Sequence, residues 1–356
     1  PMHIVENLKD HMVSIGYQGA RDPEHIEPVA LIGNAISEEA IWDCVSCGAC
    51  MEECPVVVEH IPTIMDMRRH LVLEESKMPE TGKNALLSLE QRGHPWRGTQ
   101  YSRTDWAQGL DVPTMAENPG AEVLFWVGCT GALEQRSQGI ARSMVKVLKS
   151  AGVNFAILGD EETCTGDPAR RMGNEYLYQI LAQQAIDTLN RHQVTKIVTI
   201  CPHCFNTMRN EYPKFGGDYE VLHYSQFVDE LIQKGSVKPI KMVNTTMAYH
   251  DSCFLGRHNG IYDEPRNIAK AIPGLNLVEM EGVSVLNLLV FRYSSLVSLV
   301  VLGMVAFPQS ADAQRRGRTL ERFLIMPPLP TDVADSVYVL QLADEVRMRL
   351  EGRFRY

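Results

Sequence analysis

Short apolar runs and amphipathic stretches alternate through the middle of the chain. Residues 122–127 (Glu-Val-Leu-Phe-Trp-Val) predict a buried strand, and residues 133–150 follow with the apolar spacing of an amphipathic helix. The alternation continues with a strand at 154–159, a helix at 167–192 and a strand at 196–200. Because strands that alternate with helices favour a parallel sheet, we predict a doubly wound α/β unit here.

Helical patterns dominate before this unit, and the α/β pattern starts again after it. Residues 3–14, 59–75 and 84–91 predict helices, and Ser37 predicts the start of another. Residues 93–120 are rich in proline, glycine and polar residues and predict a linker. A second, incomplete α/β unit is predicted from a strand, a helix and a strand at 247–250, 264–271 and 276–280.

The composition changes near residue 282, and residues 282–356 are predicted to be an unrelated, foreign-looking helical tail. Residues 284–307 are strongly apolar and precede an Ala-x-Ala sequence, which is typical of a secretory signal peptide. A transmembrane helix, which needs about 20 apolar residues, and a buried core helix are the alternatives. Residues 331–352 predict an amphipathic helix. We expect the tail to be the start of another polypeptide, joined here by truncation or an assembly error.

Composition narrows the class of protein. With 356 residues, 45% hydrophobic and 22% charged, the chain has room for two modest globular domains and an extension. A net charge of −10 without a dense basic run argues against a nucleic-acid partner. The nine cysteines cluster at ligand spacings, which favours a reducing compartment. The sequence opens on Pro1 without a targeting segment, and we expect a fragment or a processed product.

One cysteine run has the spacing C-x2-C-x2-C-x3-C-P, by which bacterial ferredoxin modules hold a [4Fe–4S] cluster. Its thiols belong to Cys44, Cys47, Cys50 and Cys54. Gly48 allows backbone N–H groups to approach the sulfurs, and Pro55 turns the chain away. A zinc site would pair two knuckles across a longer gap. The fourth cysteine either closes this cluster or ligates a second one whose motif lay before Pro1, and we favour the second alternative.

A second cysteine set follows the predicted strands of the α/β unit: Cys129, Cys164, Cys201 and Cys204. Ligands bind at the carboxyl ends of such strands, so the four thiols are expected to converge. They suit a cubane, a larger iron–sulfur cluster or Zn²⁺. The Cys201-Pro-His-Cys204 segment is also compatible with thiol–disulfide chemistry. We favour iron–sulfur, and the spacing alone leaves the alternatives open.

Other polar residues near these motifs are weaker candidates. His203, His223 and His250 lie close to the cysteine-bearing strand ends, where each could tune a cluster or carry a proton. A structural histidine is the more common outcome. The basic residues 68–70 could partner a negative cluster or form a solvated helix face.

The combination of motifs resembles a known family. The shared segments are Ile41-Trp-Asp-Cys44, Val58-Glu-His-Ile-Pro, Phe125-Trp-Val-Gly-Cys129, Glu162-Thr-Cys164, Gly173-Asn-Glu-Tyr, Cys201-Pro-His-Cys204 and His250-Asp-Ser-Cys253. They look like the iron–sulfur oxidoreductases with a cysteine-rich CCG domain, related to heterodisulfide reductase. Membrane-linked electron-transfer-flavoprotein:menaquinone oxidoreductases are the most similar type. The resemblance covers residues 1–281.

The resemblance implies a domain organisation and marks two departures from the family pattern. The implied parts are an α-helical ferredoxin-like [4Fe–4S] module at 1–92, a linker at 93–120, a first CCG unit at 121–240, the start of a second at 241–281, and the tail at 282–356. Thr165 replaces the second cysteine of a full CCG motif. Only Cys253 represents the ligand set of the second unit. The implied metal ligands are therefore incomplete in both units.

The function implied is that of an iron–sulfur oxidoreductase subunit. Electrons would come from a reduced electron-transfer flavoprotein or another flavoprotein and pass through the [4Fe–4S] cluster to the α/β site. The implied cofactors are this [4Fe–4S] cluster and, in the CCG unit, a second iron–sulfur cluster or a zinc ion. A quinone or a disulfide would accept them, and a membrane subunit is an expected partner. The expected place is the cytoplasm, at the inner face of the plasma membrane. The alternative is a non-catalytic zinc or metal-binding scaffold, or a thiol–disulfide protein.

Overall fold

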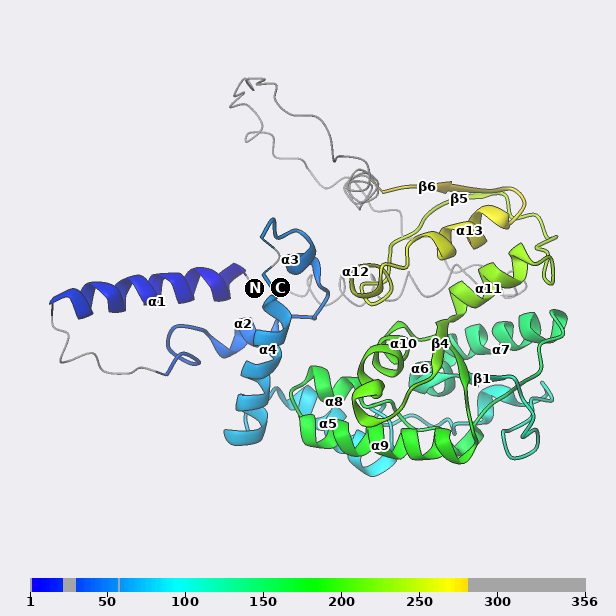
Figure 1. The fold of residues 1–356 in the computed structure, drawn as a ribbon, viewed down its shortest axis with the longest axis horizontal. Coiled ribbons are helices and arrows are strands. Elements are labelled where there is room, and N and C mark those ends of the chain that lie inside the picture. The colour runs from blue at the N-terminus through cyan, green and yellow to red at the C-terminus, as the bar shows by residue number, and fades with distance from the viewer. Residues whose placement is uncertain (1, 22–29, 57, 281–356) are drawn as a thin grey trace, which may run out of the picture. The chain divides into compact units, whose positions relative to one another are not determined.

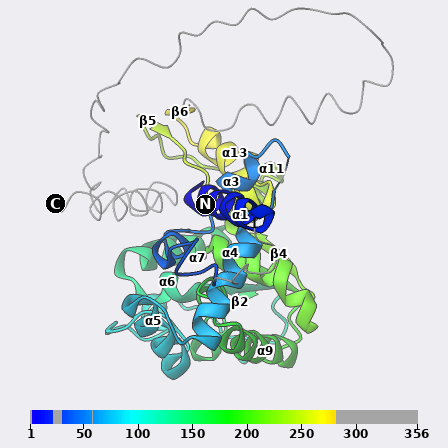
Figure 2. The ribbon, with the colours of Figure 1, turned by 90° about the vertical axis from the view of Figure 1, so that its left-hand side faces the viewer.

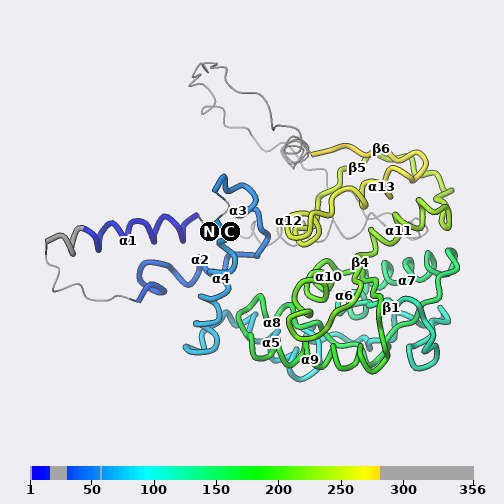
Figure 3. Tube along the Cα trace, viewed as in Figure 1, coloured from blue at the N-terminus to red at the C-terminus, as the bar shows by residue number. Residues whose placement is uncertain are grey.

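The computed structural model describes residues 2–21, 30–56 and 58–280, which form a mixed α/β protein with a parallel sheet and many helices (Figure 1). The path of the chain can be followed as a Cα trace in Figure 3. Of the described residues, those up to Val243 and Asp251–Gly274 form one compact unit, and Asn244–His250 with the residues from Leu275 onward form a second. The predictions for 284–307 and 331–352 lie outside the described residues.

The first part of the chain is helical, as predicted. Its elements are α1 (Met2–Arg21), α2 (Glu38–Trp42), α3 (Ala49–Glu52), α4 (His60–Arg69), the π-helical turn η1 (His70–Glu74) and α5 (Glu80–Arg92). Ser37 caps α2, because its side chain accepts a hydrogen bond from Ala40 N at 3.2 Å. Ile41, Ile64 and Leu71 are buried in a small core that also contacts Cys44.

A four-stranded parallel sheet organises the central part of the chain. Its strands are β1 (Val123–Trp126), β2 (Phe155–Ala156), β3 (Lys196–Thr199) and β4 (Glu220–His223), in the order β2-β1-β3-β4. The sequence predicts the strands at β1, β2 and β3 but not β4. Leu124 of β1 pairs with Ala156 on one side and Ile197 on the other, so β1 and β3 lie inside the sheet. Every residue of β1 is buried, which explains its uninterrupted apolar run.

Helices connect these strands. They are α6 (Gly128–Leu133), α7 (Gln135–Ser150), η3 (Gly159–Glu161), α8 (Asp167–Arg171), α9 (Glu175–Arg191), α10 (Pro202–Asn206), η4 (Thr207–Glu211), η5 (Tyr212–Phe215) and α11 (Tyr224–Gln233). Figures 1 and 2 show α7 and α9 on opposite sides of the strands. The single helix predicted at 167–192 is divided at Gly173, which has φ +84° and would place a Cβ 2.5 Å from the Arg68 carbonyl carbon. This glycine therefore permits close approach between α4 and the α8–α9 turn.

The segment predicted as a linker packs against the sheet. It contains a short 3-10 helix, η2 (Asp105–Ala107), whose Trp106 is buried and meets Phe125 edge to face at 6.0 Å between ring centroids. Thr114 forms an isolated parallel bridge with Ile157. Proline and glycine content identified the irregular backbone of this segment, but not its buried contacts.

Residues 251–274 contribute α12 (Gly256–Asn259) and α13 (Asp263–Ala271) to the first unit. Leu255 and Ile261 join the same apolar core as the sheet and α9. In the second unit, β5 (Thr245–Ala248) pairs in parallel with β6 (Leu275–Val278), close to the predicted strands. Within the described ranges, no helix combines the length and apolarity needed to cross a membrane.

Candidate functional site

Four cysteines gather at the carboxyl edge of the sheet, as the sequence predicts. Cys129 follows β1 in α6, Cys164 follows the turn η3, and Cys201 and Cys204 follow β3. Gly128 brings the first of them close to the last two. It has φ +78°, and a Cβ there would lie 3.5 Å from Cys201 Cβ and 3.6 Å from Cys204 Sγ.

The four thiols interact as two pairs. A hydrogen bond between Cys129 and Cys164 lowers the pKa of Cys129 despite burial and raises the pKa of Cys164. In the same way, the bond between Cys201 and Cys204 lowers the pKa of Cys201 to about 6 and raises that of Cys204. Cys164 and Cys129 also contribute to the raised pKa of Cys204, so the two pairs are electrostatic neighbours. A deprotonated thiol in each pair is the form that binds metals.

The largely buried Arg103 and the fully buried Glu162 support this set of thiols. Arg103 donates from Nη2 to Cys129 Sγ at 3.2 Å, and its Nη1 lies 3.2 Å from Glu162 Oε1. The Glu162 carboxylate also accepts hydrogen bonds from the backbone N–H groups of Val127 at 3.0 Å and Gly128 at 2.7 Å. Glu162 thereby fixes the turn before Cys129, while Arg103 places a positive charge beside the thiol.

A cavity of about 420 Å³ lies at these thiols and also reaches the first cysteine run. The lining includes Cys44, Cys129, Cys164, Cys201, Cys204, Arg68, Arg171, His203, Trp96 and Phe254. Both predicted cysteine sets therefore contribute to one cavity. This proximity could not be read from the sequence, because the two sets are separated by the whole of the α5 and η2 region.

The first cysteine run spans a tight loop with Cys44 and Cys47, the short helix α3 with Cys50, and the residues after α3 with Cys54. Burial and the neighbouring Cys44 and Cys47 thiols raise the pKa of Cys50, which indicates that these three sulfurs lie close together. Gly48 adopts φ +78° between them. The sulfur of Cys54 accepts a hydrogen bond from Val58 N at 3.4 Å.

Arg68 shapes the backbone that leads into this loop. Its guanidinium is buried and donates to the carbonyl oxygens of Ile41 at 2.8 Å, Trp42 at 3.3 Å and Cys44, and also to Arg171 O at 2.8 Å. Of the basic residues 68–70, Arg68 is therefore buried and positions the backbone of the loop by hydrogen bonds. Arg69 and His70 instead pair with carboxylates nearer the surface.

Cys253 lies next to the first cysteine run rather than in the four-thiol set. Its sulfur accepts a hydrogen bond from Arg257 Nη1 at 3.4 Å, and the same nitrogen lies 3.4 Å from the carbonyl oxygen of Cys47. The structure therefore places Cys253 near Cys47 through a shared arginine.

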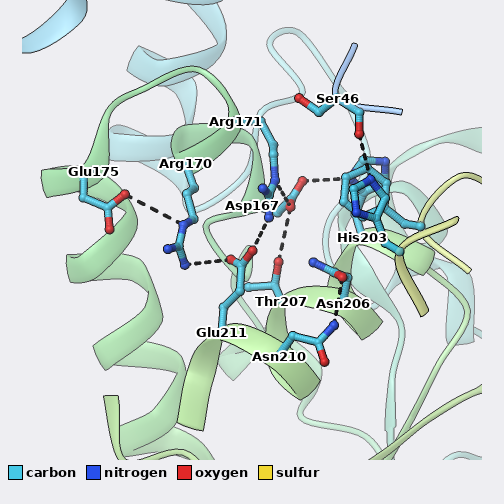
Figure 4. A network of polar contacts seen from close by, with 12 residues as sticks. Ser46, Asp167, Arg170, Arg171, Glu175, His203, Asn206, Thr207, Asn210 and Glu211 are labelled. Carbon is cyan, nitrogen blue, oxygen red and sulfur yellow. Dashed lines mark hydrogen bonds and ion pairs between the residues drawn. The ribbon is translucent and has the colours of Figure 1, made fainter. Parts of the chain in front are cut away.

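A polar network borders the cavity on the side of α8 and α10 (Figure 4). Asp167 is buried and accepts from Arg171 Nε at 3.0 Å and Thr207 Oγ1 at 3.2 Å, and its second oxygen lies 2.9 Å from His203 Nδ1. Burial alone would lower the pKa of His203, but the Asp167 carboxylate outweighs it and raises the pKa to about 9. Arg170 and Arg171 both contact Glu211. The network therefore favours the protonated form of His203, which lies between Cys201 and Cys204 in the sequence.

The other two candidate histidines do not line this cavity. His223 is buried, hydrogen bonds to Ser225 Oγ at 2.8 Å and caps α11. His250 belongs to the second unit. The sequence analysis does not predict a role for Arg103, because the residues around it have the composition of a loop. It does not predict a role for Phe254 either, although this residue directly follows Cys253. The sequence marks Glu162 only as part of a motif shared with the family.

The four cysteine thiols are sulfur donors, so they fit a metal–sulfur group better than a metal that prefers oxygen or nitrogen ligands. Soft thiolates select iron–sulfur clusters, Zn²⁺ or Cu⁺. The adjoining Arg103 and His203 supply positive charge that can balance thiolates. Among the residues described, no three histidine, cysteine, aspartate or glutamate side chains already stand in the arrangement of a single-ion site.

Comparison with known proteins identifies the central part of the chain. Residues 123–209 and 247–284 match the family described as "Cysteine-rich domain" (CCG). The chain is 46% identical over 259 residues to a probable iron-sulfur-binding oxidoreductase FadF of Bacillus subtilis, covering 71% of this chain and 37% of that protein. It is 42% identical over 265 residues to EtfAB:quinone oxidoreductase of Syntrophomonas wolfei, covering 72% and 37%.

A third relative belongs to the dihydromethanophenazine:CoB--CoM heterodisulfide reductase of Methanosarcina mazei. This polypeptide is 29% identical over 254 residues, covering 69% of this chain and 60% of its own length. No solved structure matches the chain. The chain thus spans well under half the length of the first two relatives. It carries the CCG cysteine-rich domain and is related in sequence to iron–sulfur oxidoreductases.

Proposed function

We propose that this chain is the iron–sulfur electron-transfer part of an oxidoreductase. A [4Fe–4S] cluster would be held by Cys44, Cys47 and Cys50, with Cys54 closing it or ligating a neighbouring cluster. A second iron–sulfur cluster would be held by the four-thiol set of Cys129, Cys164, Cys201 and Cys204. When bound, such clusters supply reversible one-electron chemistry.

The observation that carries this proposal is the shared cavity. All four cysteines of the second set and Cys44 of the first run line it, together with the basic residues Arg68, Arg171 and His203. Arg103 adds a positive charge beside Cys129 Sγ. Positive charge and hydrogen bonds to sulfur stabilise the more negative, reduced form of a cluster. These residues would therefore tune the potential at which each cluster accepts an electron.

The partners follow from the relatives. We propose a reduced flavoprotein as electron donor and a quinone or disulfide as acceptor, because the related proteins are named EtfAB:quinone oxidoreductase and heterodisulfide reductase. A quinone dissolves in the membrane, so a place at the inner face of the plasma membrane, with a membrane subunit, belongs to the same proposal. Cys253 would belong to the ligand set of the second CCG unit.

The organisation of the chain is proposed in the same terms. Residues 1–92 would be the α-helical ferredoxin-like module, 93–120 a connecting segment, 121–240 a doubly wound first CCG unit and 241–281 the start of the second. Residues 282–356 would be unrelated to them. The helical first part and the parallel sheet of β1–β4 are consistent with this division.

The experiment is EPR spectroscopy of the full chain, purified without oxygen and reduced with dithionite. Two paramagnetic species are expected. Cys47→Ser should remove one of them and Cys201→Ser the other, while Ser252→Ala, which changes no thiol, should leave both. A protein that shows no cluster signal in any redox state would refute the proposal.

A second candidate is thiol–disulfide exchange at Cys201 and Cys204. It is favoured by the hydrogen bond between them and by the pKa of about 6 for Cys201. Thiol counting after anaerobic metal removal separates the two: a disulfide that forms and reduces reversibly, with no iron bound beforehand, would favour this candidate.

A further inference from the structure

Three aromatic rings connect the two cysteine sets. The imidazole of His203, which lies between Cys201 and Cys204 in sequence, meets the ring of Phe254 with centroids 4.1 Å apart. Phe254 in turn stacks on His258, with centroids 4.4 Å apart and an interplanar angle of 16°. Phe254 is buried, so this contact is part of the packed interior rather than a surface encounter.

The last ring of this stack touches the loop that carries the first cysteine run. His258 Nε2 lies 2.9 Å from the carbonyl oxygen of Ser46, which stands between Cys44 and Cys47. In Figure 4 this carbonyl group points toward the rings beside His203. The stack of His203, Phe254 and His258 therefore runs without a break from one cysteine set to the other.

A second set of contacts holds the loop in the same place. Arg257 donates to Cys47 O at 3.4 Å and pairs with Glu52 Oε2 at 3.4 Å. Tyr262 donates to Glu52 Oε1 at 3.2 Å. A Cβ at Gly48 would lie 3.3 Å from His258 Nε2 and 3.4 Å from Arg257 Cβ, so the loop and residues 257–258 are in close contact.

The three stacked rings restrict one another's rotamers. Stacked rings have few torsions and are packed at interior density, so they fix the separation of the elements that carry them. Arg257 and His258 each contact a backbone carbonyl group of the loop, and these contacts position its main chain. Energetic coupling between sites travels through such contiguous packed contacts.

We propose that Phe254, Arg257 and His258 are positioning residues that hold the loop of Cys44, Cys47 and Cys50 against the four-thiol set, so that two iron–sulfur clusters exchange electrons directly. The inference rests on the proposed function. Cys44, Cys47 and Cys50 would hold the cluster that gives up one electron, and the four thiols would hold the cluster that takes it up. A reduced flavin supplies the electron, and a quinone or disulfide consumes it.

The test is the magnetic interaction between the two clusters in the fully reduced chain. Clusters held at a fixed short separation broaden and split each other's EPR signals. We expect this interaction in the wild type and its loss in Phe254→Leu, which keeps an apolar side chain but removes the ring. His258→Gln combined with Arg257→Ala should have the same effect. Phe254→Tyr should retain the interaction.

Phe227→Leu is the matched control, because Phe227 is also buried but lies in α11 and takes no part in the ring stack. Iron and acid-labile sulfide are measured for each variant, so that loss of a cluster is not mistaken for loss of coupling. Unchanged splitting in Phe254→Leu and in the double variant, at full cluster content, would overturn the inference and leave the proposed function standing. A wild type without acid-labile sulfide would overturn both.

Discussion

Arg103 donates a hydrogen bond to the sulfur of Cys129 at 3.2 Å, although 26 residues separate them in sequence. The same guanidinium pairs with Glu162, whose carboxylate receives the N–H groups of the turn before Cys129. The thiol, the arginine and the carboxylate thus form one buried unit, in which each charge compensates another.

Substitution of Arg103 should lower the free energy of unfolding. Arg103→Met leaves the Glu162 carboxylate buried without its partner, and breaking a buried ion pair costs about 3–5 kcal/mol. We expect a loss of that size in the free energy of unfolding, measured by anaerobic urea denaturation, together with reduced iron at the four-thiol set. Arg103→Lys keeps the charge and should lose less. A methionine variant as stable as the wild type would contradict this assignment.

Arg68 and its neighbour Arg69 offer a matched comparison. Arg68→Ala leaves carbonyl oxygens of Ile41, Trp42 and Cys44 without their donor, and each unsatisfied buried group costs about 1–3 kcal/mol. We therefore expect destabilisation and selective loss of the cluster signal that also depends on Cys47. Arg69→Ala removes ion pairs nearer the surface and should cost less than about 1 kcal/mol. Equal effects of the two substitutions would show that burial of Arg68 is unimportant.

The resemblance to CCG proteins implies a second motif cysteine at the position of Thr165. This threonine is buried, and its hydroxyl donates to Cys204 Sγ at 3.8 Å. Thr165→Cys adds a fifth thiol beside the four and should increase the iron bound per chain or change the EPR signal of this set. Thr165→Ser, which keeps the hydroxyl, should behave like the wild type. Identical iron content and spectra in both variants would argue against a ligand position here.

His223 should make stability depend on pH. Burial lowers its pKa from 6.5 to about 3, so the folded state resists protonation while the unfolded state takes up a proton below pH 6.5. Stability is therefore retained above pH 6.5 and falls as pH decreases below it, by up to about 1.4 kcal/mol per pH unit from this group. Urea denaturation between pH 7.5 and 5.5 should show a shallower slope for His223→Asn, which can still cap α11. Equal slopes would show that His223 is protonated in the folded state.

Much of the sheet and its cysteines could be predicted from the sequence, because the signals are local. The apolar run of β1 and the C-x-x-C after β3 place Cys129 and Cys201 at strand ends, and the structure gathers them with Cys164 and Cys204. Strand β4 escaped prediction because only Val221 and His223 of its four residues are buried. A short strand with exposed polar positions has no clear apolar pattern.

The contacts between distant segments could not be predicted in this way. Trp106 and Arg103 lie in a segment whose proline and glycine content predicts irregular structure. Nothing local marks Trp106 as buried or Arg103 as the ion-pair partner of Glu162. His258 meets Ser46 across 212 residues of sequence. Such pairs depend on how whole elements pack, and hydrophobic periodicity carries no information about their partners.

Metal and acid-labile sulfide analysis of the chain, isolated and kept without oxygen, shows directly whether its thiols hold iron–sulfur clusters. We expect a brown protein with iron and inorganic sulfide in similar amounts, and with both lowered by Cys47→Ser or Cys201→Ser. A colourless protein that contains zinc and no inorganic sulfide would contradict this expectation.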